Sequence, residues 1–376
     1  MAPPRRPARA EIVGSLLRPP ALRSAIDEVY EPGHHALLPE ERARDLSGLR
    51  AAEDAAIAEA VRRQIECGLD VVSDGEFRRW MFLNSFYDAV AGYSTDRNEV
   101  EFTNARGGHV TLTVHRIEDR LRRVDSPAAR EAAYLASITD HPFKVSFPAA
   151  SIFTHPFGLE TPAYESTDEF AAHAIELERG LIDDVIVAGC RYVQLDFPLY
   201  PYLVDEAWAE RFRSAGHRID ELLDRAIAAD RAILDLIPAG VTTGLHVCRG
   251  NYRSSWLCSG SLEPVAERMF TELPYDVFLV EWEDVGRDGD YAPIRFVPEG
   301  ATIVMGLVSS KVPDLEQEDE LLRRLDEASR YVPLEQLALS PQCGFASVVE
   351  GNDIDEDTQW RKLELVARVA DRLWGR

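Results

Sequence analysis

Two side chains that could bind a metal ion together, His246 and Cys248, stand two residues apart in the segment 243–248. The segment is short and mostly apolar, which is typical of a buried β-strand. Residues two apart on a strand point to the same side, so the imidazole and the thiol would lie next to each other. Nitrogen and sulfur are the ligands that zinc prefers in proteins. The pair alone is a weak signal, because a buried histidine and a buried cysteine at this spacing also occur by chance.

Glu281 and Cys343 are the candidates for the other two ligands of a tetrahedral site. Glu281 directly follows four apolar residues, and a carboxylate in such a place needs a partner when it is buried. Cys343 follows another strand-like segment, 337–340, and Cys258 is a reserve ligand in a loop near the first pair. The sequence therefore predicts a zinc ion bound by His246, Cys248, Glu281 and Cys343.

The elements that must position these residues alternate between strands and helices. The predicted strands are 12–15, 70–76, 144–147, 192–196, 243–248, 277–281, 302–308 and 337–340. The predicted helices are 40–67, 168–188, 204–237, 261–272, 315–330 and 355–374. Repeated alternation of this kind predicts a TIM (β/α)8 barrel, in which active sites lie at the carboxyl ends of the strands. A doubly wound sheet is the alternative, but the chain has no glycine-rich phosphate-binding turn after its first strand.

One segment, residues 99–124, departs from this alternation. Polar and apolar residues alternate there on both sides of Gly107-Gly108, which predicts a β-hairpin inserted after the second barrel strand. Residues 1–10 are rich in proline and arginine and are predicted to be a disordered tail. No linker divides the remainder, so residues 11–376 are expected to form one domain.

The composition limits the partners of the protein. The formal net charge is −24, which disfavours nucleic acid and anionic lipid as partners. No run of about 18 apolar residues is present, so no membrane span is expected. The five cysteines are widely spaced and odd in number, which indicates reduced thiols in the cytoplasm rather than a disulfide framework.

Five motifs give the chain a resemblance to a known family. They are VGSLLRP at 13–19, SDGEFRR at 73–79, QLD at 194–196, HVCRGNYRS at 246–254 and LSPQCGFAS at 339–347. With these motifs the chain resembles the catalytic C-terminal barrel of cobalamin-independent methionine synthase. It is most similar to the single-domain bacterial relatives of that barrel, and the epoxyalkane:coenzyme M transferases belong to the same broader group. The resemblance extends over nearly the whole chain from Val13 onward.

The resemblance implies roles for seven residues. The zinc ligands of the family fall on His246, Cys248, Glu281 and Cys343. The residues that hold the amino acid part of homocysteine fall on Ser15, Glu76 and Asp196. Considered as residues alone, two carboxylates at strand ends could receive an ammonium group through charge-assisted hydrogen bonds. The alternative is that these carboxylates pair with Arg78, Arg79 or Arg249.

Two positions depart from the pattern of methionine synthases. Phe197 follows the QLD motif where the family has glutamate, and Val308 occupies the position of a histidine that is thought to assist proton delivery to the folate. Lys311 and Tyr252 are possible replacements for that histidine. The departures weaken the expectation of methyl-tetrahydrofolate as donor more than they weaken the expectation of zinc.

The predicted activity is zinc-dependent transfer of a methyl or other alkyl group to a small-molecule thiol, with homocysteine as the acceptor and a small or corrinoid methyl donor. One alternative is addition of a thiol to an epoxide or related carbon, or the reverse lyase reaction. A second alternative is a barrel with a purely structural zinc ion, which would more often use a local, cysteine-rich motif. Phe153, Trp256 and Trp282 could stack on a flat donor, or could simply pack in the core or at the rim.

Overall fold

The computed structural model describes residues 8–31, 36–104, 108–156, 163–282 and 285–376. Its central sheet has six parallel strands in the order β3-β4-β5-β7-β8-β9. These strands are β3 (Val145–Pro148), β4 (Tyr192–Asp196), β5 (Thr242–Val247), β7 (Val277–Glu281), β8 (Thr302–Val308) and β9 (Leu337–Pro341). Nearly all of their residues are buried, as expected for parallel strands that are covered on both faces.

Two further segments complete the barrel. Ala10 forms a parallel bridge with Leu339 of β9, and Val72 forms one with Phe143 beside β3. The Asp70 amide donates to the Ala10 carbonyl oxygen at 2.9 Å, which joins the two segments to each other. The ring of eight parallel segments confirms the predicted TIM barrel.

The predicted strand 12–15 is placed too late, because the first segment pairs with β9 at Ala10. The predicted strand 70–76 is too long, because the second segment forms a single bridge at Val72. The chain turns away at Gly75, which has a left-handed φ of 69°. The predicted tail is also wrong for residues 8–10: Ala10 is buried in the barrel, and the Arg9 guanidinium donates to the Leu337 carbonyl oxygen at 2.6 Å. Residues 1–7 of the predicted tail lie outside the described residues.

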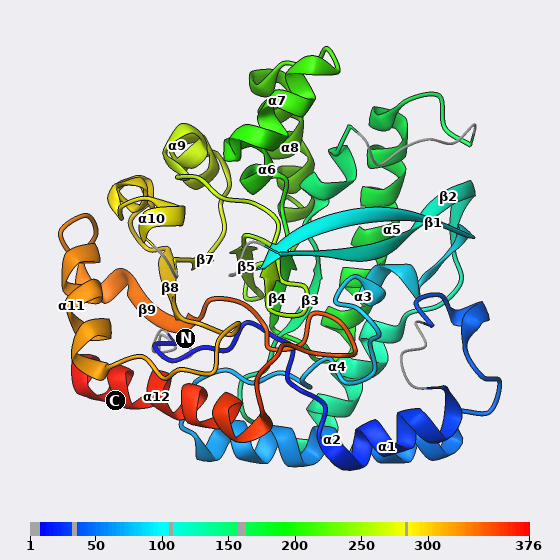
Figure 1. Cartoon of the computed structure of the whole chain (residues 1–376), viewed down its shortest axis with the longest axis horizontal. Coiled ribbons are helices and arrows are strands. Elements are labelled where there is room, and N and C mark those ends of the chain that lie inside the picture. The colour runs from blue at the N-terminus through cyan, green and yellow to red at the C-terminus, as the bar shows by residue number, and fades with distance from the viewer. Residues whose placement is uncertain (1–7, 32–35, 105–107, 157–162, 283–284) are drawn as a thin grey trace.

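Helices form the outer layer around these strands (Figure 1). The longer ones are α1 (Pro20–Val29), α2 (Ser47–Glu66), α4 (Pro127–Ile138), α5 (Thr167–Val187), α8 (Ile219–Leu234), α9 (Glu263–Glu272), α11 (Glu318–Ala328) and α12 (Glu356–Trp374). The short ones are α3 (Asn84–Tyr87), α6 (Tyr200–Val204), α7 (Glu206–Ser214) and α10 (Val285–Asp288).

Most predicted helices are present, with two corrections. The predicted helix 40–67 begins only at Ser47, as α2. The predicted helix 204–237 is divided, because Gly216 has a left-handed φ of 88° and separates α7 from α8. Helices α1 and α4 were not predicted. None of the described helices has both the length and the apolar character needed to cross a membrane.

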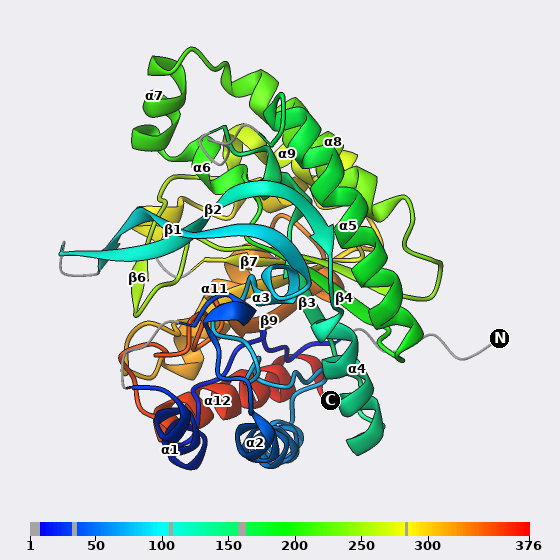
Figure 2. The ribbon, with the colours of Figure 1, turned by 90° about the vertical axis from the view of Figure 1, so that its right-hand side faces the viewer.

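The predicted hairpin is present and longer than expected. Strands β1 (Val90–Asn104) and β2 (His109–Arg123) pair antiparallel, so the hairpin begins before residue 99. Asn104 and Thr103, near its tip, pair with the two-residue strand β6 (Ser255–Trp256). Because β6 lies in the loop after β5, this pairing attaches the hairpin to the carboxyl-end face of the barrel (Figure 2).

Inward-facing residues of β4 show how the barrel interior is filled. The Tyr192 hydroxyl donates to Glu11, which also pairs with Lys144 at 2.9 Å, and all three side chains are buried. Two residues further along the strand, Gln194 donates to the Val13 carbonyl oxygen at 2.9 Å. Asp196, another two residues on, therefore stands at the carboxyl end above a closed interior.

Candidate metal centre and substrate cavity

Three of the four predicted metal ligands come together at the carboxyl ends of the strands. His246 lies in β5, Cys248 follows the end of β5, and Cys343 follows β9. One ligand atom from each of them lies within 4.8 Å of the others, and all three residues are buried. The Cys343 Sγ is 3.6 Å from the His246 Nε2. A nitrogen and two sulfurs converging from separate strands are a donor set that fits zinc.

The three side chains affect one another's protonation. The hydrogen bond from the Cys248 thiol, aided by His246 and Lys311, lowers the pKa of Cys343 well below its usual value. The same hydrogen bond, together with burial, raises the pKa of Cys248 well above its usual value. Burial disfavours the charged form of His246, but the neighbouring Cys343 outweighs this effect and raises the pKa of the imidazole. The cluster therefore ionises first at Cys343, and a metal cation would favour loss of the remaining protons.

The fourth predicted ligand, Glu281, is not part of this group of three. It ends β7 and is fully buried, with its Oε1 accepting from Lys311 at 3.1 Å and from Arg287 at 2.9 Å. Its Oε2 accepts from the Arg249 backbone amide at 2.7 Å. The carboxylate is close enough to act electrostatically on His246 and Cys248, but hydrogen bonds occupy both of its oxygens.

The reserve ligand Cys258 is also outside the group of three. It is buried, and its backbone amide donates to the Arg249 carbonyl oxygen at 2.9 Å. Burial raises the pKa of its thiol well above the usual value, which keeps it protonated. Cys258 thus behaves as a core residue next to the centre.

A cavity of about 460 Å³ brings the predicted metal and substrate residues together. Its lining includes His246, Cys248 and Cys343, and it also includes Ser15, Glu76 and Asp196. Glu281, Lys311 and Tyr252 are not among the described lining residues. Val308 is buried at the end of β8 and does not line the cavity either. The proposed replacements for the family histidine are therefore not placed at the cavity surface.

Asp196 is held by a neighbour on its own strand. The Gln194 amide donates to its Oδ1 at 2.7 Å, and the carboxylate is buried. Burial raises the pKa of Asp196, while the nearby His246 opposes that rise. Among the described residues, no arginine forms an ion pair with this carboxylate, so the alternative of an arginine partner is wrong for Asp196.

Glu76 stands in a left-handed backbone conformation, with a φ of 56°. The Ser146 hydroxyl donates to its Oε1 at 2.9 Å, and Arg79 lies 3.8 Å away. Arg79 is mainly engaged with Glu131, to which it donates at 2.6 Å. Burial raises the pKa of Glu76 to about 7, and the charges of Asp196 and Asp74 support that rise against the opposing effect of Arg79. An additional cation next to Glu76 would therefore restore its charged form.

The other two arginines proposed as alternative partners are used elsewhere. Arg78 pairs with Asp54, and Arg249 lies 3.4 Å from Asp288. Among the described contacts, one of the proposed pairs between a substrate carboxylate and an arginine is present, the 3.8 Å contact between Arg79 and Glu76.

Ser15 links the substrate side of the cavity to the metal side. Its hydroxyl accepts from the Ala346 amide at 3.2 Å, and its carbonyl oxygen accepts from the Phe345 amide at 2.9 Å. Any side chain at Gly344 would collide with the Ser15 hydroxyl, so glycine is needed directly after Cys343. The loop that carries Cys343 is thereby fixed to the loop that carries Ser15.

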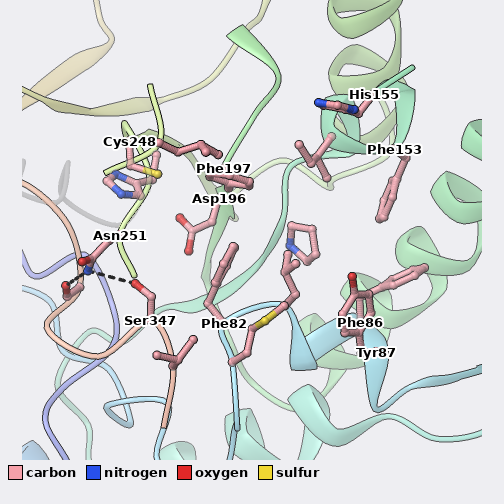
Figure 3. A pocket seen from close by; sticks show the side chains of 18 of the residues that line it. Phe82, Phe86, Tyr87, Phe153, His155, Asp196, Phe197, Cys248, Asn251 and Ser347 are labelled. Carbon is pink, nitrogen blue, oxygen red and sulfur yellow. Dashed lines mark hydrogen bonds between the residues drawn. The ribbon is translucent and has the colours of Figure 1, made fainter. Parts of the chain in front are cut away.

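Several lining residues were not predicted. The Asn251 amide donates to the Gly344 carbonyl oxygen at 2.7 Å and to the Ser347 hydroxyl at 3.1 Å (Figure 3). Further from the metal ligands the lining is aromatic and, besides the already considered Phe153, includes Phe82, Phe86, Phe197, Tyr202 and Trp208. A cluster of aromatic residues at 80–87, directly after the SDGEFRR motif, is the signal that could have indicated this wall.

The three aromatic residues considered as stacking partners for a flat donor lie in different places. Phe153 lines the cavity. Trp282 is buried and donates from Nε1 to the Gly289 carbonyl oxygen at 3.2 Å, which makes it a core residue. Trp256 lies in β6 and carries the Arg287 guanidinium 5.0 Å from its ring centre. Neither tryptophan is among the described lining residues.

Comparison with known proteins gives consistent results. A family described as the catalytic domain of cobalamin-independent synthase matches residues 40–352. The uncharacterized protein YxjG of Bacillus subtilis is 34% identical, over 98% of this chain and 95% of its own length. The structure of a putative vitamin-B12 independent methionine synthase from Listeria monocytogenes has a TM-score of 0.73 and 28% identity, covering 98% of this chain and 99% of that one. A 2-hydroxypropyl-CoM lyase of Xanthobacter autotrophicus is 22% identical over 77% of this chain and 78% of its own.

The resemblance predicted from the five motifs is therefore confirmed over most of the chain. The family match includes Glu76, Asp196 and every proposed metal ligand, and Ser15 lies upstream of it. The Listeria structure supports the barrel architecture over almost the whole length. The chain belongs to the family of cobalamin-independent synthase catalytic domains.

Proposed function

We propose that the protein is a zinc-dependent enzyme that transfers a methyl or other alkyl group to a thiol, with homocysteine as the acceptor. The observation that carries the proposal is one cavity lined both by the His246, Cys248 and Cys343 cluster and by Ser15, Glu76 and Asp196. The first set suits a metal-bound thiolate, and the second suits an amino acid. Family membership supports methyl transfer to homocysteine as the reaction type.

The donor set supports zinc as the metal. Two thiolates and an imidazole are soft and borderline ligands, and zinc accepts all of them in tetrahedral geometry. Zinc bound here would favour the thiolate form of the substrate, which is the nucleophilic form at neutral pH. We propose Glu281 as the fourth protein ligand, although it would have to give up part of its contact with Lys311 and Arg287. These two cations would offset the negative charge of two thiolates and a carboxylate.

The carboxylates of Glu76 and Asp196 would bind the ammonium group of homocysteine. Both are buried and both have raised pKa values, and Arg79 makes only a long contact with Glu76, so an ammonium group would stabilise the charged form of each. Charge-assisted hydrogen bonds to an ammonium group would fix the amino acid and leave its thiol pointing towards His246, Cys248 and Cys343. In the transfer step a bond forms between the substrate sulfur and the alkyl carbon. The bond from that carbon to its former partner breaks, and the partner keeps the electron pair.

The identity of the donor distinguishes the two candidate functions. A small donor would fit in the cavity beside homocysteine, whereas a corrinoid would have to present its methyl group at the entrance. The second candidate is addition of the thiol to an epoxide or related carbon, or the reverse lyase reaction, and it is supported by the similarity to 2-hydroxypropyl-CoM lyase.

A purely structural zinc is disfavoured because the cluster lines a cavity and its ligands come from two strands, β5 and β9.

The test is a panel of thiols assayed with the zinc-loaded protein. Homocysteine and 2-mercaptoethanesulfonate would be compared with a methyl donor and with an epoxide. Methionine formation that depends on zinc supports the first function. Turnover of only the sulfonate thiol with the epoxide favours the second.

The remaining proposals concern the setting of the enzyme. The five free cysteines support a reducing, cytoplasmic compartment. We also propose that residues 11–376 act as one domain, since the hairpin is paired with the loop after β5 and contributes to the cavity wall.

A further inference from the structure

A row of four aromatic rings runs along the cavity away from the substrate carboxylates. Phe82 packs edge-to-face on Phe197 at 5.6 Å, Phe197 on Tyr202 at 5.7 Å, and Tyr202 on Trp208 at 4.9 Å. All four line the cavity, and the row includes the residue directly after Asp196. Figure 3 shows Phe82 and Phe197 near Asp196, with Phe86 and Phe153 further along the lining. The part of the cavity next to Glu76 and Asp196, called the amino acid end, thus continues directly into the part lined by the four rings, called the aromatic end.

The backbone of Phe197 directs a large ring to this place. Its φ is 61°, a left-handed conformation that is unfavourable for a bulky residue. The conformation persists because surrounding contacts hold it, among them the bond from the Phe197 amide to the His246 carbonyl oxygen at 3.3 Å. Phe197 and Phe82 are only partly buried, so both rings keep apolar surface available to a ligand. Strain of this kind commonly marks a functional position.

The described lining of the cavity has only four carboxylate or guanidinium side chains, Glu76, Asp196, Arg116 and Arg211. The carboxylates of the cavity, Glu76 and Asp196, belong to the amino acid end. His155 packs against Tyr202 and Trp208, and burial lowers its pKa to about 4, so the ring is neutral at neutral pH. Arg116 and Arg211 are exposed, and the Arg211 guanidinium lies 4.3 Å from the centre of the Trp208 ring, at the far end of the row. A neutral apolar group is the ligand that such a wall favours.

Resting on the function proposed above, we propose that the row formed by Phe82, Phe197, Tyr202 and Trp208 binds an uncharged, apolar body of the alkyl donor. The donor class is then a neutral molecule with an aliphatic chain or an aromatic ring. Its reacting carbon would face the thiol, and its body would cover the exposed ring surfaces. Phe197 separates the two ends and sets the boundary between amino acid and donor.

The consequence can be measured without knowing the donor. Each methylene group that moves from water onto the rings should improve affinity about fourfold. We would titrate the purified zinc-loaded protein with primary alcohols from ethanol to hexanol and determine the dissociation constants by ligand-observed NMR. The expected result is a stepwise fall in the dissociation constant with chain length. A flat series, or tighter binding of hexanoate than of hexanol, would overturn the proposal.

Two variants locate the effect. Phe82→Ser and Phe197→Ser should each weaken hexanol binding at least tenfold, while Phe82→Leu should retain most of it because an apolar side chain remains. Phe296→Ser is the matched control, since Phe296 is partly buried, packs under Arg295 and does not line the cavity. Unchanged hexanol binding in both serine variants would refute the assignment.

Zinc content and homocysteine binding, measured on the same samples, separate this inference from the proposed function. A protein that binds zinc and homocysteine but gives a flat alcohol series contradicts only the inference. A protein that gives the expected series but binds no zinc contradicts the proposed function, and with it the assignment of the row to an alkyl donor.

Discussion

Replacing Glu76 by glutamine should stabilise the protein at pH 8 and weaken its binding of homocysteine. The Glu76 carboxyl is buried, and its pKa is raised from 4.5 to about 7. A folded-state pKa above the unfolded value means that the folded protein retains a proton which the unfolded chain has already released. The free energy of unfolding therefore falls as the pH rises from about 4.5 to about 7.

The size of this effect follows from the same two values. At 1.36 kcal/mol for each pH unit, the interval from 4.5 to about 7 corresponds to about 3 kcal/mol, and about 2.5 kcal/mol of it falls between pH 5 and pH 8. Glutamine keeps a similar shape and can still accept the hydrogen bond from Ser146, but it does not ionise. The free energy of unfolding of the variant, relative to that of the wild type, should thus be about 2.5 kcal/mol more favourable at pH 8 than at pH 5.

The assay is urea unfolding of both proteins at pH 5 and at pH 8, with the free energy of unfolding taken from each titration. Glu221→Gln, which removes an exposed carboxylate, serves as the control for loss of one acidic group. In parallel, homocysteine affinity at pH 8 should fall about tenfold to a hundredfold, because a charge-assisted hydrogen bond is lost. A stability difference that does not change with pH, or unaltered homocysteine affinity, would refute the reasoning.

The other predictions concern the metal, the amino acid end and the donor. Cys248→Ser and Cys343→Ser should each lose most of the bound zinc in metal analysis while circular dichroism stays unchanged, because the apolar core does not depend on the metal; full zinc retention in both would contradict the site. Asp196→Asn should raise KM for homocysteine about tenfold or more at constant zinc content, and normal turnover would make a thiol without an amino group the better candidate. Methyl-tetrahydrofolate should transfer its methyl group to homocysteine more slowly than methylcobalamin, because the buried Val308 cannot protonate a departing amine; the opposite order of rates would restore the ordinary methionine synthase reaction.

The barrel could be predicted because most of its strands have a strong local pattern. Strands β7 and β8 were predicted with the bounds that the structure has. Short, continuous apolar segments are typical of buried parallel strands and are too short for an ordinary helix. The first segment was predicted too late in the chain, since its bridge to β9 lies at Ala10. The second was predicted too long, because the chain turns at Gly75 and presents Glu76 rather than extending a ladder. The division of the predicted helix 204–237 depends on the left-handed backbone of Gly216. The sequence alone does not tell whether a glycine ends a helix or is tolerated within it.

The site was predictable to the extent that strand ends determine it. His246, Cys248 and Cys343 come together because the carboxyl ends of the barrel strands, here β5 and β9, meet at one face. The pairing of Glu281 with Lys311 and Arg287 was not predicted, since it depends on loop conformations after β7 and β8. Apart from Phe153, the aromatic wall was not predicted, because its rings come from distant segments and each one alone resembles an ordinary core residue.

X-ray absorption spectroscopy at the zinc edge, combined with metal analysis, tests the central claim most directly. We expect close to one zinc ion per chain, with two sulfur neighbours at about 2.3 Å in the protein alone. Addition of homocysteine should increase the number of sulfur neighbours to three, because the substrate thiolate joins Cys248 and Cys343. Absence of stoichiometric zinc, or a sulfur count that homocysteine leaves unchanged, would contradict a metal centre that activates the thiol.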